Sequence, residues 1–289
     1  MQQRVIFDFE VDFSNGGGMQ GQDFRLDIPG ADISDEELAR AIIRDMRLLM
    51  VGDVRILKKE IIAEKHKRGS GSGYIDLSHT VYDGLVTYKG LPAPIICDYL
   101  SREASRERYA PGTEFQIGKI EMVANTGTYV DCPFHRYADG KDLAQVALEA
   151  FADLDGLLVH ADYRKDLAVT AAAFKDLNLA DKAVLVHTGW AERWATDAYF
   201  ESNPFLTEDA AVYLRDKGAR LVGIDSLNID DTRGGDRPVH STLLKAEILV
   251  AEHLCNLESL PAQGFSFSAI PPKFQGVGTF PVRAFARLT

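Results

Sequence analysis

The chain has 289 residues, of which 46% are hydrophobic, and this length suits one large domain or one domain with a small companion. Its formal net charge of −11 and its pI near 5.1 argue against nucleic acid and anionic membranes as partners, because both attract clustered Lys and Arg. Three widely spaced cysteines, Cys97, Cys132 and Cys255, supply neither a disulfide framework nor a CxxC zinc pattern. With no signal-peptide pattern and no apolar run of about 20 residues, the sequence predicts a cytoplasmic protein.

The N-terminal part predicts a hairpin followed by a helix. Apolar and polar residues alternate over 5–13, which indicates a half-buried strand, and 23–28 can form the return strand after a glycine-rich loop. Ser34 and Glu37 are spaced as a capping box, and apolar residues then recur at helical spacing over 37–51. A small α/β unit is therefore expected here.

A Gly/Ser stretch, GSGSG at 69–73, separates this unit from the rest of the chain. Such repeats bury nothing and behave as flexible coil, so we predict a linker, engineered or natural, between domains covering 1–68 and 74–289. Residues 54–68, just before it, fit a strand or a second helix equally well. The N-terminal domain has no motif that carries chemistry, and we expect it to pack on the larger domain through an apolar face. That face would comprise Phe7, Phe9, Val11 and Phe13 with the apolar side of the helix.

The larger domain alternates strands with helical stretches, which is typical of an α/β fold. Continuous apolar runs that fit buried strands lie within 182–190, 219–230 and 245–257. Residues 147–163 predict a helix and then a strand, and 206–219 predict a helix. Several of the strand-like runs end in polar residues, so we expect side chains from separate strands to converge on one pocket.

Residues 125–135 read N-T-G-T-Y-V-D-C-P-F-H and follow a predicted strand. This stretch resembles the signature H-x-G-T-H-x-D-x-P-x-H of the cyclase family, which includes bacterial kynurenine formamidase and isatin hydrolase. The similarity continues in four further segments, so that it spans 74–289: they are 75–84, 185–190, 221–230 and 240–260. The resemblance implies a β-rich α/β fold with a small barrel-like core, and a homo-oligomer such as a dimer or tetramer.

The resemblance also implies a metal site. Family members hold one or two divalent ions, usually zinc or manganese, which activate water and polarise a carbonyl for hydrolysis of an amide or lactam. Asp131, His240 and Glu252 stand at family ligand positions. His135 stands at the signature histidine that gives and accepts protons in the family.

Two signature histidines are replaced in this chain, by Asn125 and Tyr129. An amide is a poor zinc ligand, and a phenol must lose its proton, from a reference pKa of about 10, to bind a metal well. The three remaining ligands can still hold one ion with an open position. Alternatively, Tyr129 and His135 move protons without a metal, and Asp131 orients His135.

Three classes of function are therefore open. The first is a hydrolase of a small cyclic or N-acyl amide, lactam or lactone that uses one divalent ion. The second is a metal-independent cyclase, dehydratase or isomerase, and the third is a non-catalytic binding subunit. The expected substrate-binding residues are Asn125, Phe134, Tyr137 and Trp190, and core packing explains the three aromatic residues equally well.

Overall fold

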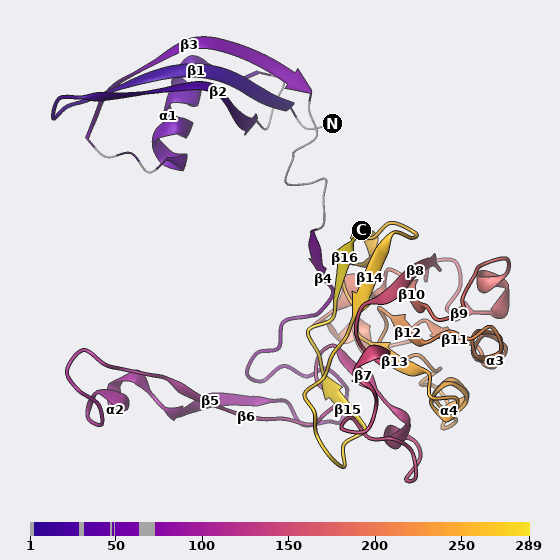
Figure 1. Ribbon diagram of the computed structural model, residues 1–289. Helices are drawn as coiled ribbons and strands as arrows, with labels where there is room; N and C mark the ends of the chain where they lie inside the picture. The colour runs from indigo at the N-terminus through magenta and orange to yellow at the C-terminus, as the bar shows by residue number, and fades with distance from the viewer. Residues whose placement is uncertain (1–2, 29–31, 47, 49, 64–72) are drawn as a thin grey trace. The chain divides into compact units, whose positions relative to one another are not determined.

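The computed structural model describes residues 3–28, 32–46, 48, 50–63 and 73–289, and the chain divides into two compact units, 1–73 and 74–289 (Figure 1). Of the five positions of the predicted linker only Gly73 is described, and the other four lie outside the described residues.

The N-terminal unit is a three-stranded antiparallel sheet with one helix, in the strand order β2-β1-β3. Its elements are β1 (Gln3–Phe13), β2 (Gly18–Ile28), α1 (Asp35–Asp45) and β3 (Val51–Ala63). The capping box before α1 is confirmed, since the Glu37 amide donates to Ser34 Oγ at 3.2 Å and the Ser34 amide donates to Glu37 Oε2 at 3.1 Å. Residues 54–63 form a strand rather than a helix, because β1 gives β3 an antiparallel partner along its whole length.

The apolar face of β1 is covered inside this unit. The cluster beneath it contains Phe7, Phe9, Val11, Leu38 and Ile42, with Phe13 packed against them. The prediction that the phenylalanines of β1 dock on the larger domain is therefore wrong, because α1 already removes this face from water. Packing of residues 1–68 on the rest of the chain through another surface stays a prediction.

The second unit is built on a nine-stranded mixed sheet in the order β15-β7-β13-β12-β10-β8-β14-β16-β4. The central strands β13, β12, β10 and β8 are parallel, and the flanking strands pair antiparallel. The bounds are β4 (Tyr74–Asp76), β7 (Tyr129–Asp131), β8 (Leu154–His160), β10 (Ala183–His187), β12 (Leu221–Ile224), β13 (Leu249–Glu252), β14 (Phe265–Ser268), β15 (Thr279–Pro281) and β16 (Phe285–Leu288). The sheet curls into a half barrel (Figure 1), so the predicted β-rich α/β class is confirmed.

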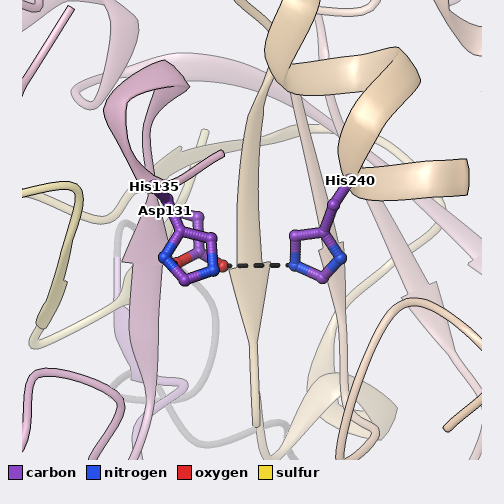
Figure 2. Close-up of side chains that lie close together, drawn as sticks. All are labelled: Asp131, His135 and His240. Atoms are coloured by element: carbon purple, nitrogen blue, oxygen red, sulfur yellow. Dashed lines mark ion pairs between the residues drawn. The ribbon is translucent and has the colours of Figure 1, made fainter. Parts of the chain in front are cut away.

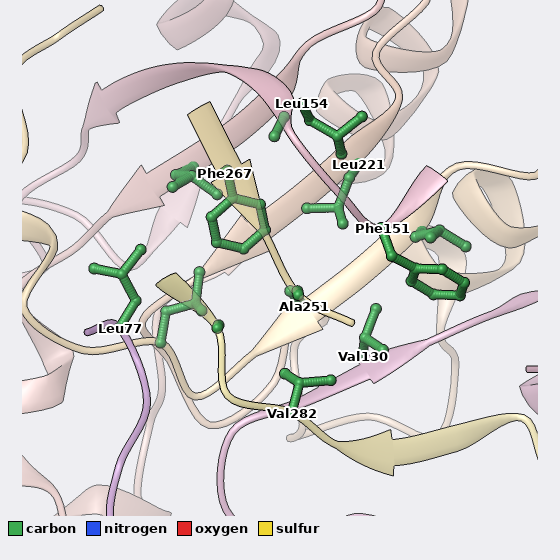
Figure 3. Packing of buried hydrophobic residues seen from close by; sticks show 14 of the residues in the cluster. Leu77, Val130, Phe151, Leu154, Leu221, Ala251, Phe267 and Val282 are labelled. Carbon is green, nitrogen blue, oxygen red and sulfur yellow. The ribbon is translucent and has the colours of Figure 1, made fainter. Parts of the chain in front are cut away.

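Both faces of the central strands are buried. The helices α3 (Glu208–Asp216) and α4 (Pro238–Lys245) cover one face, where Val222 and Val250 pack. Their chain neighbours Leu221 and Leu249 belong to the core cluster on the other face, where Figure 3 shows Leu221. Burial on both faces explains why these strands read as continuous apolar runs in the sequence.

Short elements fill the connections. The strands β9 (Ala168–Val169) and β11 (Phe205–Leu206) pair in parallel. Single turns of 3₁₀ helix occur at η1 (Pro133–His135), η2 (Leu148–Ala150), η3 (Ala171–Phe174), η4 (Trp190–Arg193), η5 (Asp197–Phe200) and η6 (Leu257–Ser259). The helix expected at the start of 147–163 is thus reduced to η2, and the strand that was expected after it is β8.

A two-stranded ribbon projects from the body of the second unit (Figure 1). It pairs β5 (Ile95–Leu100) with β6 (Ile117–Glu121), and α2 (Arg102–Arg106) lies in the connection. Large apolar side chains are exposed along it at Ile95, Tyr99, Tyr109, Phe115, Ile117 and Ile120. Isolated ribbons are only marginally stable, and exposed apolar surface commonly marks contact sites, so this ribbon is a candidate contact for another chain. The predicted homo-oligomer itself stays a prediction.

None of the helices in the described part of the chain combines the length and the apolar character that crossing a bilayer requires.

Candidate active site

The strands β7 and β13 bring distant parts of the predicted site together. Tyr129 of β7 is the cross-strand partner of Glu252 of β13, although the two are far apart in the sequence. His135 follows β7 in η1, and His240 lies in the first turn of α4. A cavity of about 670 Å³ opens over these residues. It is lined by Tyr88, Leu91, Asn125, Tyr129, His135, Arg136, Glu208, Asn228, Gly235, Asp236, Arg237, Pro238, His240, Ser241 and Glu252.

Asp131 lies fully buried beneath this cavity. Its Oδ1 accepts a hydrogen bond from the Thr279 hydroxyl, and its Oδ2 has no hydrogen-bond partner among the described residues. Burial acts to raise the pKa of the Asp131 carboxyl, but the imidazoles of His240 and His135 and the Thr279 hydroxyl outweigh burial and hold that pKa below its usual range. Asp131 is therefore a buried carboxylate with one oxygen that accepts no hydrogen bond within the described part of the chain.

His240 is held in place by a second carboxylate. Its Nδ1 bonds to Asp230 Oδ2 at 2.6 Å, which leaves Nε2 facing Asp131 Oδ2 and Glu252 Oε1, each at 3.5 Å. Burial lowers the pKa of His240, but Glu252, Asp131 and Asp230 overcome that effect and raise it to about 10. The hydrogen bond between Nδ1 and Asp230 thus fixes the position of Nε2 between two carboxylates.

Glu252 is bound on both carboxylate oxygens. Its Oε2 accepts a hydrogen bond from the Tyr129 hydroxyl, and its Oε1 accepts from the Ile229 amide at 2.6 Å. Burial, with a contribution from Asp131, raises the pKa of Glu252 to about 7. Burial and the charge of Glu252 also raise the pKa of Tyr129 well above its ordinary value, while a side-chain hydrogen bond from Asn125 acts in the opposite direction. The Tyr129 hydroxyl is therefore a neutral donor to Glu252.

The hydrogen bonds of Thr279 define which nitrogen of His135 is free. The Thr279 hydroxyl has one proton and donates it to Asp131, which as a carboxylate can only accept. Thr279 Oγ1 also lies 2.6 Å from His135 Nδ1, so this nitrogen must be the donor of that bond. His135 Nε2 then carries the free lone pair beside the cavity. The predicted link from Asp131 to His135 therefore runs through Thr279, because the direct distance from Asp131 Oδ1 to His135 Nδ1 is 3.6 Å.

A glycine allows Thr279 to reach both partners. A Cβ atom added at Gly278 would lie 2.2 Å from the His135 backbone nitrogen, which no real side chain tolerates. The Gly278 carbonyl accepts from the Cys132 amide at 2.8 Å, so the chain before β15 runs directly against the signature loop. The close approach made by this glycine brings Thr279 between Asp131 and His135.

Donor atoms of Asp131, His135 and His240 all lie within 4.8 Å of one another, and Figure 2 shows the three side chains converging. Glu252 adjoins this group, because its Oε1 lies 3.5 Å from His240 Nε2. The structure thus gathers every predicted catalytic and metal-ligating residue around one centre. Asn125 lines the cavity beside them.

The three aromatic residues expected in the substrate site lie elsewhere. Phe134 packs against the core cluster that includes Val130 and Cys132. Trp190 is buried and donates from Nε1 to the Tyr199 carbonyl at 3.1 Å, and Tyr137 donates its hydroxyl to the Ser241 carbonyl at 2.8 Å. None of the three lines the cavity, so the prediction of aromatic walls from these residues is corrected. Tyr88 and Leu91 are the large apolar residues of the lining.

Two residues with clear structural roles at the site, Asp230 and Thr279, were not predicted. Asp230 lies in the segment 221–230 that resembles the family, so the resemblance could have identified it as a site residue. Thr279 lies in a Gly-Thr-Phe-Pro stretch with no pattern of spacing or composition that points to the site.

A second cavity, of about 710 Å³, opens at the carboxyl ends of β8 and β10 and is lined in part by His160 and His187. It contains none of the predicted site residues. The first cavity is therefore the candidate active site.

A family profile described as "Putative cyclase" matches residues 75–231. The chain is similar to the kynurenine formamidase of Geobacillus thermodenitrificans, with 27% identity over 184 residues that cover 63% of this chain and 85% of the relative. It is also similar to a solved structure described as a potential metal-dependent hydrolase with cyclase activity, with 25% identity, a TM-score of 0.63, and coverage of 76% of this chain and 99% of the other. Isatin hydrolase A from Labrenzia aggregata shares the fold, with a TM-score of 0.65 at 21% identity over 77% of this chain and 96% of the other.

Proposed function

We propose that this chain, which belongs to the cyclase family, hydrolyses an amide bond of a small N-acyl or cyclic substrate with one divalent metal ion. One observation carries the proposal: His240 Nε2 lies 3.5 Å from Asp131 Oδ2, which is buried and accepts no hydrogen bond from any residue that the structure describes, and 3.5 Å from Glu252 Oε1. The similarity to a kynurenine formamidase and to a metal-dependent hydrolase supports amide hydrolysis.

The residues present fit a divalent cation. Three buried carboxylates, from Asp131, Asp230 and Glu252, surround the single imidazole of His240. Buried negative charge in this excess is costly unless a cation compensates it. Asp230 also orients His240 from behind, as the outer partners of metal-bound histidines do. We propose Asp131, His240 and Glu252 as the ligands, and a set of two carboxylates and one imidazole suits zinc or manganese.

A bound ion would polarise the amide carbonyl and acidify the attacking water. The chain itself supplies the proton transfer. His135 Nε2 is free because Nδ1 is committed to Thr279, so it can take the proton of the attacking water and return it to the departing nitrogen. Thr279, in turn held by Asp131, keeps this imidazole in the required tautomer.

Purification without chelator tests this proposal. We expect about one equivalent of zinc or manganese per chain, since the residues form one set of ligands. We also expect hydrolysis of a simple N-formyl arylamine such as formanilide. Dialysis against a chelator should remove both the metal and the activity, and added metal should restore them. Hydrolysis at an unchanged rate by fully metal-free protein would contradict the proposal.

In the metal-independent alternative, the Tyr129 hydroxyl donates its proton to the substrate. In the structure this hydroxyl donates to Glu252, so we propose that it positions a ligand instead. The Tyr129→Phe variant keeps the ring and removes only the hydroxyl. We expect it to weaken metal affinity and turnover by roughly 10–100-fold, the usual effect of losing an outer partner of a ligand, and we expect excess metal to rescue turnover.

Titration of metal into the stripped variant, followed by kinetics at saturating metal, measures both effects. If Tyr129 were the proton donor of a metal-free reaction, turnover would instead fall by about 10²–10³-fold and metal would not restore it.

A further inference from the structure

Two arginines, Arg136 and Arg237, line the candidate active site next to helix α4. Arg136 directly follows His135, and its Nε donates to Ser241 Oγ at 3.2 Å. Ser241 is the residue after His240 in α4. The Arg136 side chain therefore links the loop that carries His135 to the helix that carries His240.

Arg237 is held by the backbone at the start of the same helix. Its Nη1 donates to the carbonyls of Gly234 at 2.9 Å and Asp236 at 2.8 Å, with a longer bond to the Asp231 carbonyl at 3.3 Å. Arg237 precedes His240 by three residues, so the two are about one helical turn apart. Both arginines are thus placed by polar contacts beside the centre where the amide would react.

Neither guanidinium has a carboxylate partner within 4 Å in the part of the chain that the structure describes. The cavity lining also contains the exposed acids Glu208 and Asp236, and neither forms an ion pair with Arg136 or Arg237. Two exposed arginines of this unit provide a contrast, since Arg233 pairs with Asp231 and Arg283 pairs with Asp76. Two positioned guanidinium groups in one cavity, neither of them in an ion pair with a described residue, are an arrangement that binds an anionic ligand group.

We propose that the substrate carries a carboxylate next to the scissile amide, and that Arg136 and Arg237 bind this carboxylate. The inference rests on the proposed amide hydrolysis and names its substrate class: N-acyl amino acids, including aromatic ones, and related amido acids. Planar guanidinium groups match the two oxygens of a carboxylate, which fixes the direction in which the amide enters the site. Residues 136 and 237 then determine specificity, while the reaction itself takes place at His135 and the proposed metal ligands.

A matched pair of probes tests the proposal. N-formylanthranilate and formanilide share the same aryl formamide, and only the first has a carboxylate beside it. In both, water breaks the C–N bond, and formate and the free arylamine are released. We expect wild-type kcat/KM to favour N-formylanthranilate. The ratio of the two kcat/KM values should fall by roughly 10–100-fold in Arg136→Gln and in Arg237→Gln, the usual range for a charge-assisted hydrogen bond.

Arg233→Gln is the control, because Arg233 is paired with Asp231 and does not line the cavity. It should leave the ratio at the wild-type value. Arg136→Lys, which keeps the charge without the planar fork, should give an intermediate ratio. An unchanged ratio in both glutamine variants would overturn the inference and leave amide hydrolysis standing.

Binding of benzoate, measured by calorimetry, separates the two proposals if neither probe is hydrolysed. Benzoate affinity at least tenfold weaker in both glutamine variants would support the carboxylate subsite while amide hydrolysis fails. Equal affinity in wild type and variants would overturn the subsite.

Discussion

Replacing His135 with alanine is expected to lower kcat by roughly 10²–10⁴-fold, the usual contribution of a positioned acid-base group. The reason is the free Nε2 of His135, whose other nitrogen is bound to Thr279. The metal content of the variant should remain that of wild type, because the proposed ligands are Asp131, His240 and Glu252. Steady-state kinetics and metal analysis on the same preparation measure the two quantities together.

The result also decides between two roles for His135, whose donor atoms lie within 4.8 Å of those of Asp131 and His240. Loss of the metal together with activity would make His135 a ligand and contradict its role as proton carrier. Thr279 provides a matched pair of further variants. Thr279→Val removes the link to His135 and should lower kcat and alter its pH profile, whereas Thr279→Ser keeps the hydroxyl and should restore both.

Acidification from pH 6.5 to about 3 is expected to remove about 4 kcal/mol from the free energy of unfolding through His253 alone. Burial lowers the pKa of His253 to about 3, against an ordinary value of 6.5. The folded chain therefore keeps this imidazole neutral over the range in which the unfolded chain binds a proton. Stability is complete above pH 6.5 and is lost progressively as the pH falls toward the folded pKa.

His79 contributes in the same direction, because burial lowers its pKa to about 4. Its ring stacks on Trp194 with a centroid distance of 3.9 Å. His79→Phe keeps a stacking ring and removes the titration, so its stability should depend less steeply on pH between 6.5 and 4. Chemical denaturation of metal-free protein at several pH values measures the slope. A wild-type stability that stays constant over this interval would show that His253 and His79 are not protected from protons in the folded state.

The sequence predicted that Asp131, His135 and His240 would lie close together, and the structure places them so. Asp131 ends β7 and His135 lies in η1 four residues later, so their spacing alone places them together. His240 and Glu252 came from the resemblance, which relates separate segments, and β13 and α4 bring both to that loop. The replaced positions Asn125 and Tyr129 were also visible in the sequence, but the hydrogen bond from Tyr129 to Glu252 was not.

Contacts between distant segments were not predicted from the sequence. Thr279 meets His135 across 144 positions, and no local pattern records such a pairing. Trp190 and Tyr137 were assigned to the pocket because large aromatic side chains suit a pocket wall and a core equally well, and composition does not separate the two. The alternation in β1 revealed an apolar face without revealing that α1 covers it.

The register of β7 against β13 has a consequence for substitutions at position 129. Tyr129 stands opposite Glu252 because the backbones of two strands pair there, whatever side chain position 129 carries. Position 129 thus faces the carboxylate through the backbone pairing, and a substitution there changes the hydrogen-bond partner of Glu252 without a change in the strands. The scaffold therefore permits either an imidazole or a phenol at position 129 to meet the Glu252 carboxylate.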